Sequence, residues 1–151
     1  MKIIFTTEVL VVDISEIERE LQEHGLKITK SRRAILRVIS RSSARLSPAQ
    51  IHRRARRSYR RLGLVTVYRT LALLEALGLV QRVHTETDCH GFALVRVPKG
   101  HHHPLICKEC GRVEEFSDCG SEPLLARLQR ETGFAIESHH LEVIGYCPKC
   151  Q

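Results

Sequence analysis

Residues 101–111 read HHHPLICKECG, so three histidines stand shortly before a Cys-x-x-Cys pair. A second Cys-x-x-Cys pair, at Cys147 and Cys150, lies at the C-terminus. Each pair can hold one side of a metal ion, and two pairs complete the tetrahedral four-thiolate shell of a structural zinc site. Disulfides are the alternative, but the equal spacing and the nearby histidines favour zinc in a reducing cytoplasm. The predicted zinc ligands are Cys107, Cys110, Cys147 and Cys150.

The three histidines predict a second metal site, because four cysteines already complete the first. Neighbouring side chains on a strand point to opposite faces, so His101 and His103 share one face and His102 occupies the other. Glu122 and His139 are the expected partners on the face of His101 and His103. Three imidazoles and one carboxylate form a plausible tetrahedral zinc site, since both ligand types suit zinc.

The face that carries His102 predicts a further site, which would draw ligands from the region that joins the two halves of the chain. An ion held by both halves would fix their relative orientation, as a metal-controlled switch requires. Surface histidine is the alternative for His84 and for His90 taken singly, and Cys119 is expected to be a small buried apolar side chain. The hinge ligands considered are His102, Glu115, Cys89, His90 and His84.

The net charge of +7 is divided unevenly along the chain. Residues 1–83 carry 17 Lys and Arg against 7 Asp and Glu, whereas residues 84–151 carry 7 against 10. A basic half joined to an acidic half rich in Cys and His is typical of a polyanion-binding unit fused to a sensor. The apolar first 14 residues are interpreted as an extra arm, because they are too short to span a membrane and lack a signal-peptide cleavage site.

Helix-start signals recur through the basic half. Ser15 predicts the start of one helix, and Thr29 predicts the start of the next. Ser47, followed by Pro48, begins a third helix, which is expected to carry the six arginines between residues 53 and 61. This region is therefore predicted to be mainly helical.

The third helix is expected to lead into a fourth helix and a strand hairpin. Thr66 is predicted to cap the fourth helix and Gly78 to end it, with strands following at 79–84 and 92–97. Helices followed by a hairpin indicate a winged helix-turn-helix.

Beyond the hairpin, the pattern predicts a small α/β unit. Strands are expected at 101–107, 112–116 and 134–146, with a helix at 123–131. The fold class is therefore α+β. Its parts are a winged-helix DNA-binding domain over 1–83 (including the arm at 1–14), a wing end and hinge over 84–100, and a metal-binding dimerisation domain over 101–151.

The helix after Thr66 is the predicted DNA-recognition helix, because the second helix of such a motif enters the major groove. Arg69 can donate two hydrogen bonds to a guanine, and Tyr68 can contact a thymine methyl group or a phosphate. The arginines of the preceding helix suit phosphates, which position a protein without specifying sequence. A solvated charged face is the alternative. The expected DNA-binding residues are Lys27, Arg32, Thr66, Tyr68 and Arg69.

Four segments, taken in this order, resemble the ferric uptake regulator family of bacterial repressors. They are GLKITKSRRAIL at 25–36, TVYRTLALLEALGLV at 66–80, HHHPLICKECG at 101–111 and GYCPKC at 145–150. The resemblance implies a homodimer whose winged helices read an AT-rich inverted repeat of double-stranded DNA. It also implies structural zinc on the four cysteines, a regulatory metal on the set with His103 and His139, and part of a hinge site at His102 and Glu115.

Departures from the family pattern bear on which metal is sensed. Pro104 stands where the family usually has another histidine, and Ala93 to Val95 stand where it has a glutamate or cysteine on the hairpin. His103 replaces an aspartate that is common in iron sensors, which favours the zinc uptake regulator branch. An iron or manganese sensor is the alternative.

Two other function classes are less favoured. A zinc hydrolase needs an open metal position and a nearby general base, and no general-base motif accompanies the histidines. A metal-storing or structural adaptor would carry the basic face only incidentally, and DNA affinity that is independent of metal and of sequence would favour it. The sequence therefore predicts a metal-responsive DNA-binding repressor and not an enzyme.

Overall fold

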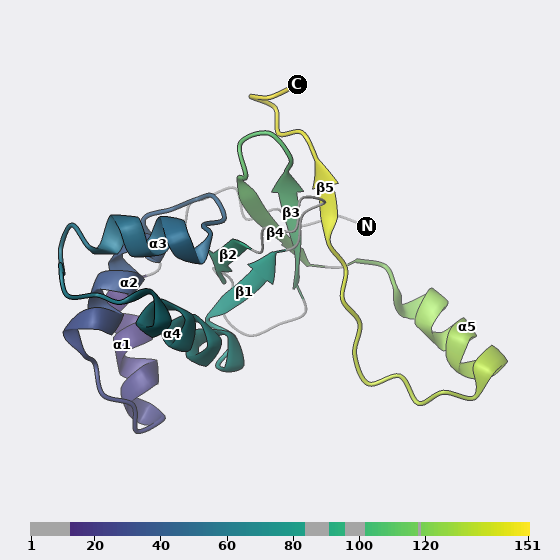
Figure 1. The fold of residues 1–151 in the computed structure, drawn as a ribbon. Helices are drawn as coiled ribbons and strands as arrows, with labels where there is room; N and C mark the ends of the chain where they lie inside the picture. The colour runs from purple at the N-terminus through teal and green to yellow at the C-terminus, as the bar shows by residue number, and fades with distance from the viewer. Residues whose placement is uncertain (1–12, 84–90, 96–101, 118) are drawn as a thin grey trace.

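The computed structural model describes residues 13–83, 91–95, 102–117 and 119–151. Helices and strands follow one another as the sequence predicts, in a mixed fold with two small sheets (Figure 1). The first half contains α1 (Ile14–Glu23), α2 (Lys30–Ser40), α3 (Pro48–Ala55), α4 (Leu64–Ala76), β1 (Val80–Val83) and β2 (Gly91–Leu94). The second half contains β3 (His102–Cys107), β4 (Val113–Ser117), α5 (Glu122–Thr132) and β5 (Val143–Gly145). None of the helices described here is long and apolar enough to span a membrane.

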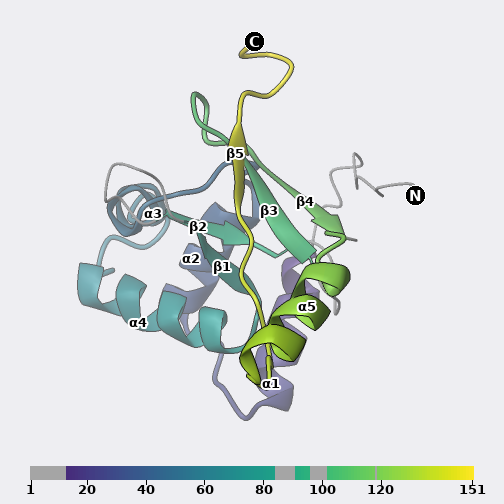
Figure 2. The same ribbon diagram turned by 90° about the vertical axis from the view of Figure 1, so that its right-hand side faces the viewer.

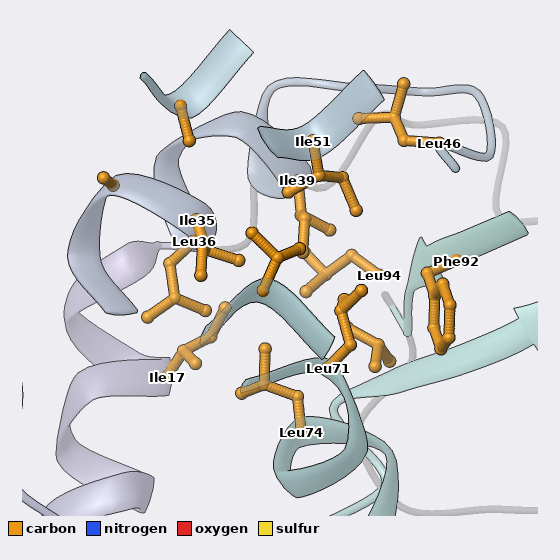
Figure 3. Close-up of a cluster of buried hydrophobic side chains, with 14 of the residues drawn as sticks. Ile17, Ile35, Leu36, Ile39, Leu46, Ile51, Leu71, Leu74, Phe92 and Leu94 are labelled. Atoms are coloured by element: carbon orange, nitrogen blue, oxygen red, sulfur yellow. The ribbon is translucent and has the colours of Figure 1, made fainter. Parts of the chain in front are cut away.

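The main core lies between the four N-terminal helices and the β1–β2 hairpin (Figure 3). Each helix turns an apolar stripe inward, and β2 closes the cluster from the side of the hairpin. The labelled members of this core are Ile17, Ile35, Leu36, Ile39, Leu46, Ile51, Leu71, Leu74, Phe92 and Leu94. The helices and the hairpin therefore form one packed body.

The predicted start signals are confirmed at two helices. The backbone N–H of Arg32 donates to the Thr29 hydroxyl over 3.2 Å, which caps α2. At α3, Gln50 N–H donates to the Ser47 hydroxyl over 3.2 Å, while Ser47 N–H donates to the Gln50 side-chain oxygen over 2.8 Å. This reciprocal pair is a complete capping box. α3 ends at Ala55, so the last four arginines of the basic run lie in the turns before α4.

Two start predictions were wrong. Asp13 caps α1 in place of Ser15, whose N–H donates to the Asp13 carboxylate over 3.0 Å. A carboxylate two residues before Ser15 satisfies one of the free N–H groups of the first turn, so the helix begins sooner. α4 begins after Gly63 without a side-chain cap, which leaves Thr66 inside its first turn. The second helix of the motif is therefore three residues longer at its N-terminus than expected.

The C-terminal sheet has the order β4-β3-β5. β3 pairs antiparallel with β4 and parallel with β5, which lies at an edge (Figure 2). Only Val143–Gly145 form the strand that was expected over 134–146, because these are the residues that pair with Leu105–Cys107. The preceding residues return the chain from α5, which stands apart from the rest of the molecule and buries none of its residues.

A short loop ties the helical half to the C-terminal sheet. Arg45 N–H donates to Gly111 carbonyl oxygen over 3.0 Å, and Val113 N–H donates to Ser43 carbonyl oxygen over 3.1 Å. Leu46 in turn exchanges two backbone hydrogen bonds of 2.9 Å with Phe92 of β2. The loop therefore contacts both small sheets.

Candidate metal centres and nucleic-acid interface

The four cysteines of the two Cys-x-x-Cys pairs come together in the fold. Cys107 ends β3 and Cys147 follows β5, and these strands run parallel, so the pairs meet at the same end of the sheet. The ligand atoms of all four cysteines lie within 4.8 Å of one another, and the Cys110 and Cys147 sulfurs are 3.8 Å apart. A tetrahedral zinc ion with bonds of about 2.3 Å places two sulfurs roughly 3.8 Å apart. The cluster therefore fits the predicted zinc site.

The electrostatics of this cluster favour a bound cation. Backbone N–H groups, first that of Cys110 and then that of Cys147, stabilise the Cys107 thiolate and lower its pKa to about 6. The pKa of Cys150 is raised to about 12, first because its thiol is hydrogen-bonded to Cys147. One thiol therefore ionises readily, whereas hydrogen bonding and burial keep another protonated. A divalent ion would displace the remaining protons and let all four cysteines bind as thiolates.

A second group of ligands forms on the His103 face of β3. The Nε2 atoms of His103 and His139 are 3.2 Å apart, and Cys119 Sγ lies 3.4 Å from His139 Nε2. The three ligand atoms all lie within 4.8 Å of one another. His103 is buried, whereas Cys119 and His139 are half-buried. The structure thus brings together two of the histidines predicted for the regulatory site.

The membership of this group differs from the prediction in two ways. Glu122 is exposed in the first turn of α5 and is not part of the group. Cys119 takes part, although it was expected to be a buried apolar residue. No local sequence pattern marked this residue, because its place depends on the register in which Phe116, three residues earlier, pairs with His103. His101 lies outside the described residues.

On the opposite face, the structure places two of the five hinge ligands considered. The register pairs His102 with Ser117 and Pro104 with Glu115, so His102 and Glu115 share a face of the sheet. The buried Glu115 accepts a hydrogen bond of 3.0 Å from Gln81 of β1, a residue that sequence reasoning did not single out. The other three, His84, Cys89 and His90, lie outside the described residues.

A hollow of about 670 Å³ adjoins both faces. It is lined by residues of β1, of β3 and of the segment that returns from α5, among them Gln81, His102, His139 and Glu142. The Nδ1 atom of His102 is buried and has no hydrogen-bond partner among the described residues. A buried imidazole nitrogen of this kind suits a metal or an ordered water as its partner.

The predicted recognition helix presents the expected residues. The buried residues of α4 include Val67, Leu71 and Leu74, whereas Tyr68 is 54% exposed and Arg69 is exposed. Thr66 is half-buried. The N-terminal part of α4 can therefore contact another molecule through its outer side.

The two residues expected at the entrance of α2 differ in their surroundings. Lys27 is exposed, but Arg32 donates its Nη1 to the Lys27 carbonyl oxygen and so braces the turn before α2. A separate basic hollow of about 620 Å³ lies beside α3. Its lining consists of His52, Arg53, Arg56, Arg57 and Arg60. Such a concentration of guanidinium groups suits phosphate oxygens.

The ferric uptake regulator family model matches residues 23–144. The chain belongs to the ferric uptake regulator family. The ferric uptake regulation protein of Cupriavidus metallidurans is 39% identical over 132 residues, which cover 86% of this chain and 90% of the relative. Family members are metal-responsive transcription regulators and not enzymes, so the hydrolase alternative is excluded.

Solved structures of the family cover nearly the whole chain. A zinc uptake regulator complexed with zinc and DNA is 26% identical, covers 95% of this chain and 94% of its own, and has a TM-score of 0.74. A zinc-bound manganese uptake regulator is 31% identical, covers 87% of this chain and 98% of its own, and has a TM-score of 0.60. These regulators are named for different metals, so the comparisons establish the family and the fold without the metal.

Proposed function

We propose that this ferric uptake regulator family protein is a zinc-responsive repressor that binds an AT-rich inverted repeat as a homodimer in the cytoplasm. In this proposal residues 1–83 contact DNA, residues 84–100 form the wing end and hinge, and residues 101–151 bind metal and dimerise. The observation that carries the proposal is the second ligand group, His103 with Cys119 and His139, which is separate from the complete four-cysteine cluster. A metal bound there is free to act as a signal, because the structural site does not need it.

Zinc is favoured over iron and manganese by the ligand types. The second group offers imidazole nitrogen and thiol sulfur, and no carboxylate of the described residues belongs to it. Imidazole suits zinc, and sulfur ligands select zinc, whereas carboxylate and water oxygens suit manganese. An iron- or manganese-responsive regulator is the second candidate, supported by the names of the relatives.

Metal would act on DNA binding by selecting one arrangement of the chain. The segment that carries His139 returns from α5 to β5, so an ion on His103 and His139 would tie this segment to the sheet. The dimer would then hold its two recognition helices at the spacing of the two half-sites. A coupling of about 1–3 kcal/mol, or roughly 5–150-fold in affinity, is sufficient for such control.

Dimerisation is supported by apolar surface on the C-terminal half. Leu124 and Leu128 are 48% and 36% exposed on α5, and Phe134 just beyond it is 73% exposed. The edge strand β5 exposes Val143 and Ile144 in addition. Among the described residues β5 pairs on one side only, and such an edge strand together with an apolar helix face suits a second copy of the chain.

Specific DNA recognition is assigned to Arg69, with Tyr68 beside it. Selection from a pool of random duplexes with zinc present should yield an inverted repeat for the unaltered protein. Arg69→Ala should weaken binding to that repeat by about 1–3 kcal/mol and relax its sequence preference. Arg57→Ala, which removes a guanidinium from the basic hollow, should instead reduce the salt dependence by about one unit and leave the preference intact. Equal losses for Arg69→Ala on every duplex would contradict a base-reading role.

A further inference from the structure

We infer that Cys119 is a thiolate ligand of the regulatory metal, together with His103 and His139, and that this sulfur makes the site prefer zinc to manganese or iron. The inference rests on the proposed function, because it names the group that sets the metal preference of the same site. Glu122, which the family resemblance implies as a ligand, is then not needed for the preference.

The distances fit a tetrahedral zinc ion. With bonds of about 2.05 Å to nitrogen and 2.3 Å to sulfur, a tetrahedral ion separates two nitrogens by roughly 3.3 Å and a nitrogen from a sulfur by roughly 3.6 Å. The two imidazole Nε2 atoms are 3.2 Å apart, and the Cys119 sulfur is 3.4 Å from His139 Nε2. The three ligand atoms therefore already define two edges of a zinc tetrahedron.

The surroundings hold these three side chains in place. His103 is buried in β3, with its ring 5.6 Å from Phe116 and 5.0 Å from the His139 ring, measured between centroids. The Ser121 hydroxyl lies 3.0 Å from the Cys119 sulfur and 3.3 Å from His139 Nε2. The hydroxyl can donate to a bound thiolate, which is the kind of outer partner that orients a metal ligand.

A thiolate changes the chemistry of the site in two respects. Its negative charge offsets part of the charge of a divalent ion. The complex of such an ion with two neutral imidazoles and one thiolate therefore has a net charge of +1. Sulfur is also a soft donor that selects zinc, whereas manganese favours carboxylate and water oxygens. The fourth position stays open for water or for Glu122, which begins α5 three residues later.

Cobalt(II) provides a direct test in the full-length protein, because thiolate-to-cobalt charge transfer absorbs in the near ultraviolet. The protein is first loaded with one zinc per protomer to fill the four-cysteine cluster, and cobalt is then added. The unaltered protein should gain a charge-transfer band with the added cobalt, and Cys119→Ser should lose it. Cys119→Ser should also bind the second zinc more weakly, by at least the roughly 10–100-fold that loss of an outer partner costs.

Two further variants sharpen the test. Ser138→Ala, an exposed neighbour of His139, should keep both the band and the zinc affinity. Cys119→Asp should keep a second metal but move its preference from zinc toward manganese, since an oxygen donor replaces sulfur. Retention of one zinc per protomer and of an unchanged circular dichroism spectrum shows that a variant is folded.

Three results would overturn the inference. The first is a Cys119→Ser variant that keeps both the band and the zinc affinity. The second is loss of the band in Cys89→Ser, which would place the thiolate ligand in the hinge region. Absence of the band in the unaltered protein would equally exclude a thiolate ligand. The proposed function would be contradicted by a different measurement, namely a DNA affinity that does not change with any metal. Failure of the inference and failure of the proposed function are therefore distinguishable.

Discussion

Gln81 of β1 donates a hydrogen bond of 3.0 Å from its side-chain amide to the buried carboxylate of Glu115 on β4. This bond links the hairpin of the helical half to the sheet that carries the metal-ligand clusters. It lies on the face where the sequence predicted a hinge metal. A direct hydrogen bond to Glu115 therefore already joins the two halves at this point.

Loss of the Gln81 amide should destabilise the protein. Gln81→Ala is expected to lower the free energy of unfolding by about 1.5 kcal/mol. This value is the lower end for a hydrogen bond to a charged group, and we choose it because Gln81 is half-buried. Chemical denaturation of the zinc-loaded protein measures the change. Gln22→Ala, at an exposed position of α1, is the matched control and should be neutral. Equal stability of the two variants would contradict a structural role for this bond.

Removal of the four-cysteine zinc should unfold the C-terminal sheet. Structural zinc supplies about 10–16 kcal/mol of apparent binding energy in zinc-finger peptides, and this energy is folding energy. Cys150→Ser should therefore lose one zinc per protomer and melt at a markedly lower temperature. Metal analysis with thermal melting measures both effects. A Cys150→Ser protein that retains its full zinc content would show that Cys150 is not a ligand.

Disruption of the apolar face of α5 should shift the protein toward monomer. Leu128→Asp places a carboxylate in the exposed stripe that Leu124 and Leu128 form one helical turn apart. Ala126→Asp introduces the same charge on the opposite side of the helix, where it should leave the dimer intact. Sedimentation equilibrium distinguishes the two variants. The same mass for both would exclude this face as the interface.

Acid should remove the stabilising contact between α1 and α2. The hydrogen bond from Arg33 holds the pKa of Glu18 below its ordinary value of 4.5. A lowered folded-state pKa contributes stability above the unfolded pKa, and this contribution is lost as pH falls through the folded pKa. The stability difference between the unaltered protein and Glu18→Gln should therefore shrink below about pH 4.5.

Denaturation midpoints measured from pH 7 to pH 3 test this dependence. The effect should be small, because Arg33 is nearly half exposed and surface ion pairs are weak. Glu23→Gln, an exposed acid at the end of α1, serves as the control and should show no such pH dependence. A difference for Glu18→Gln that persists at pH 3 would mean that charge is not its source.

Local rules predicted much of this fold from sequence. The capping box at Ser47 and the apolar stripe of α4 were predictable because they depend only on residue spacing. The four-cysteine cluster was predictable for the same reason, since each Cys-x-x-Cys pair forms its own metal-binding turn.

Features that depend on tertiary placement escaped prediction. Cys119 joins the His103 group only because β4 pairs with β3 in one particular register. The bond between Gln81 and Glu115 joins residues 34 positions apart in the chain, and no local pattern marks it. The length of β5 is similarly determined by its partner strand.

Metal control of specific DNA binding can be measured as DNA affinity at buffered free zinc. The affinity is measured on an AT-rich inverted repeat and on a scrambled duplex, and then again with manganese in place of zinc. We expect an affinity that rises with zinc on the repeat alone, by roughly 5–150-fold. An equal response to manganese would contradict zinc sensing. Affinity that ignores both metals, on an operator selected from random duplexes, would contradict metal control itself.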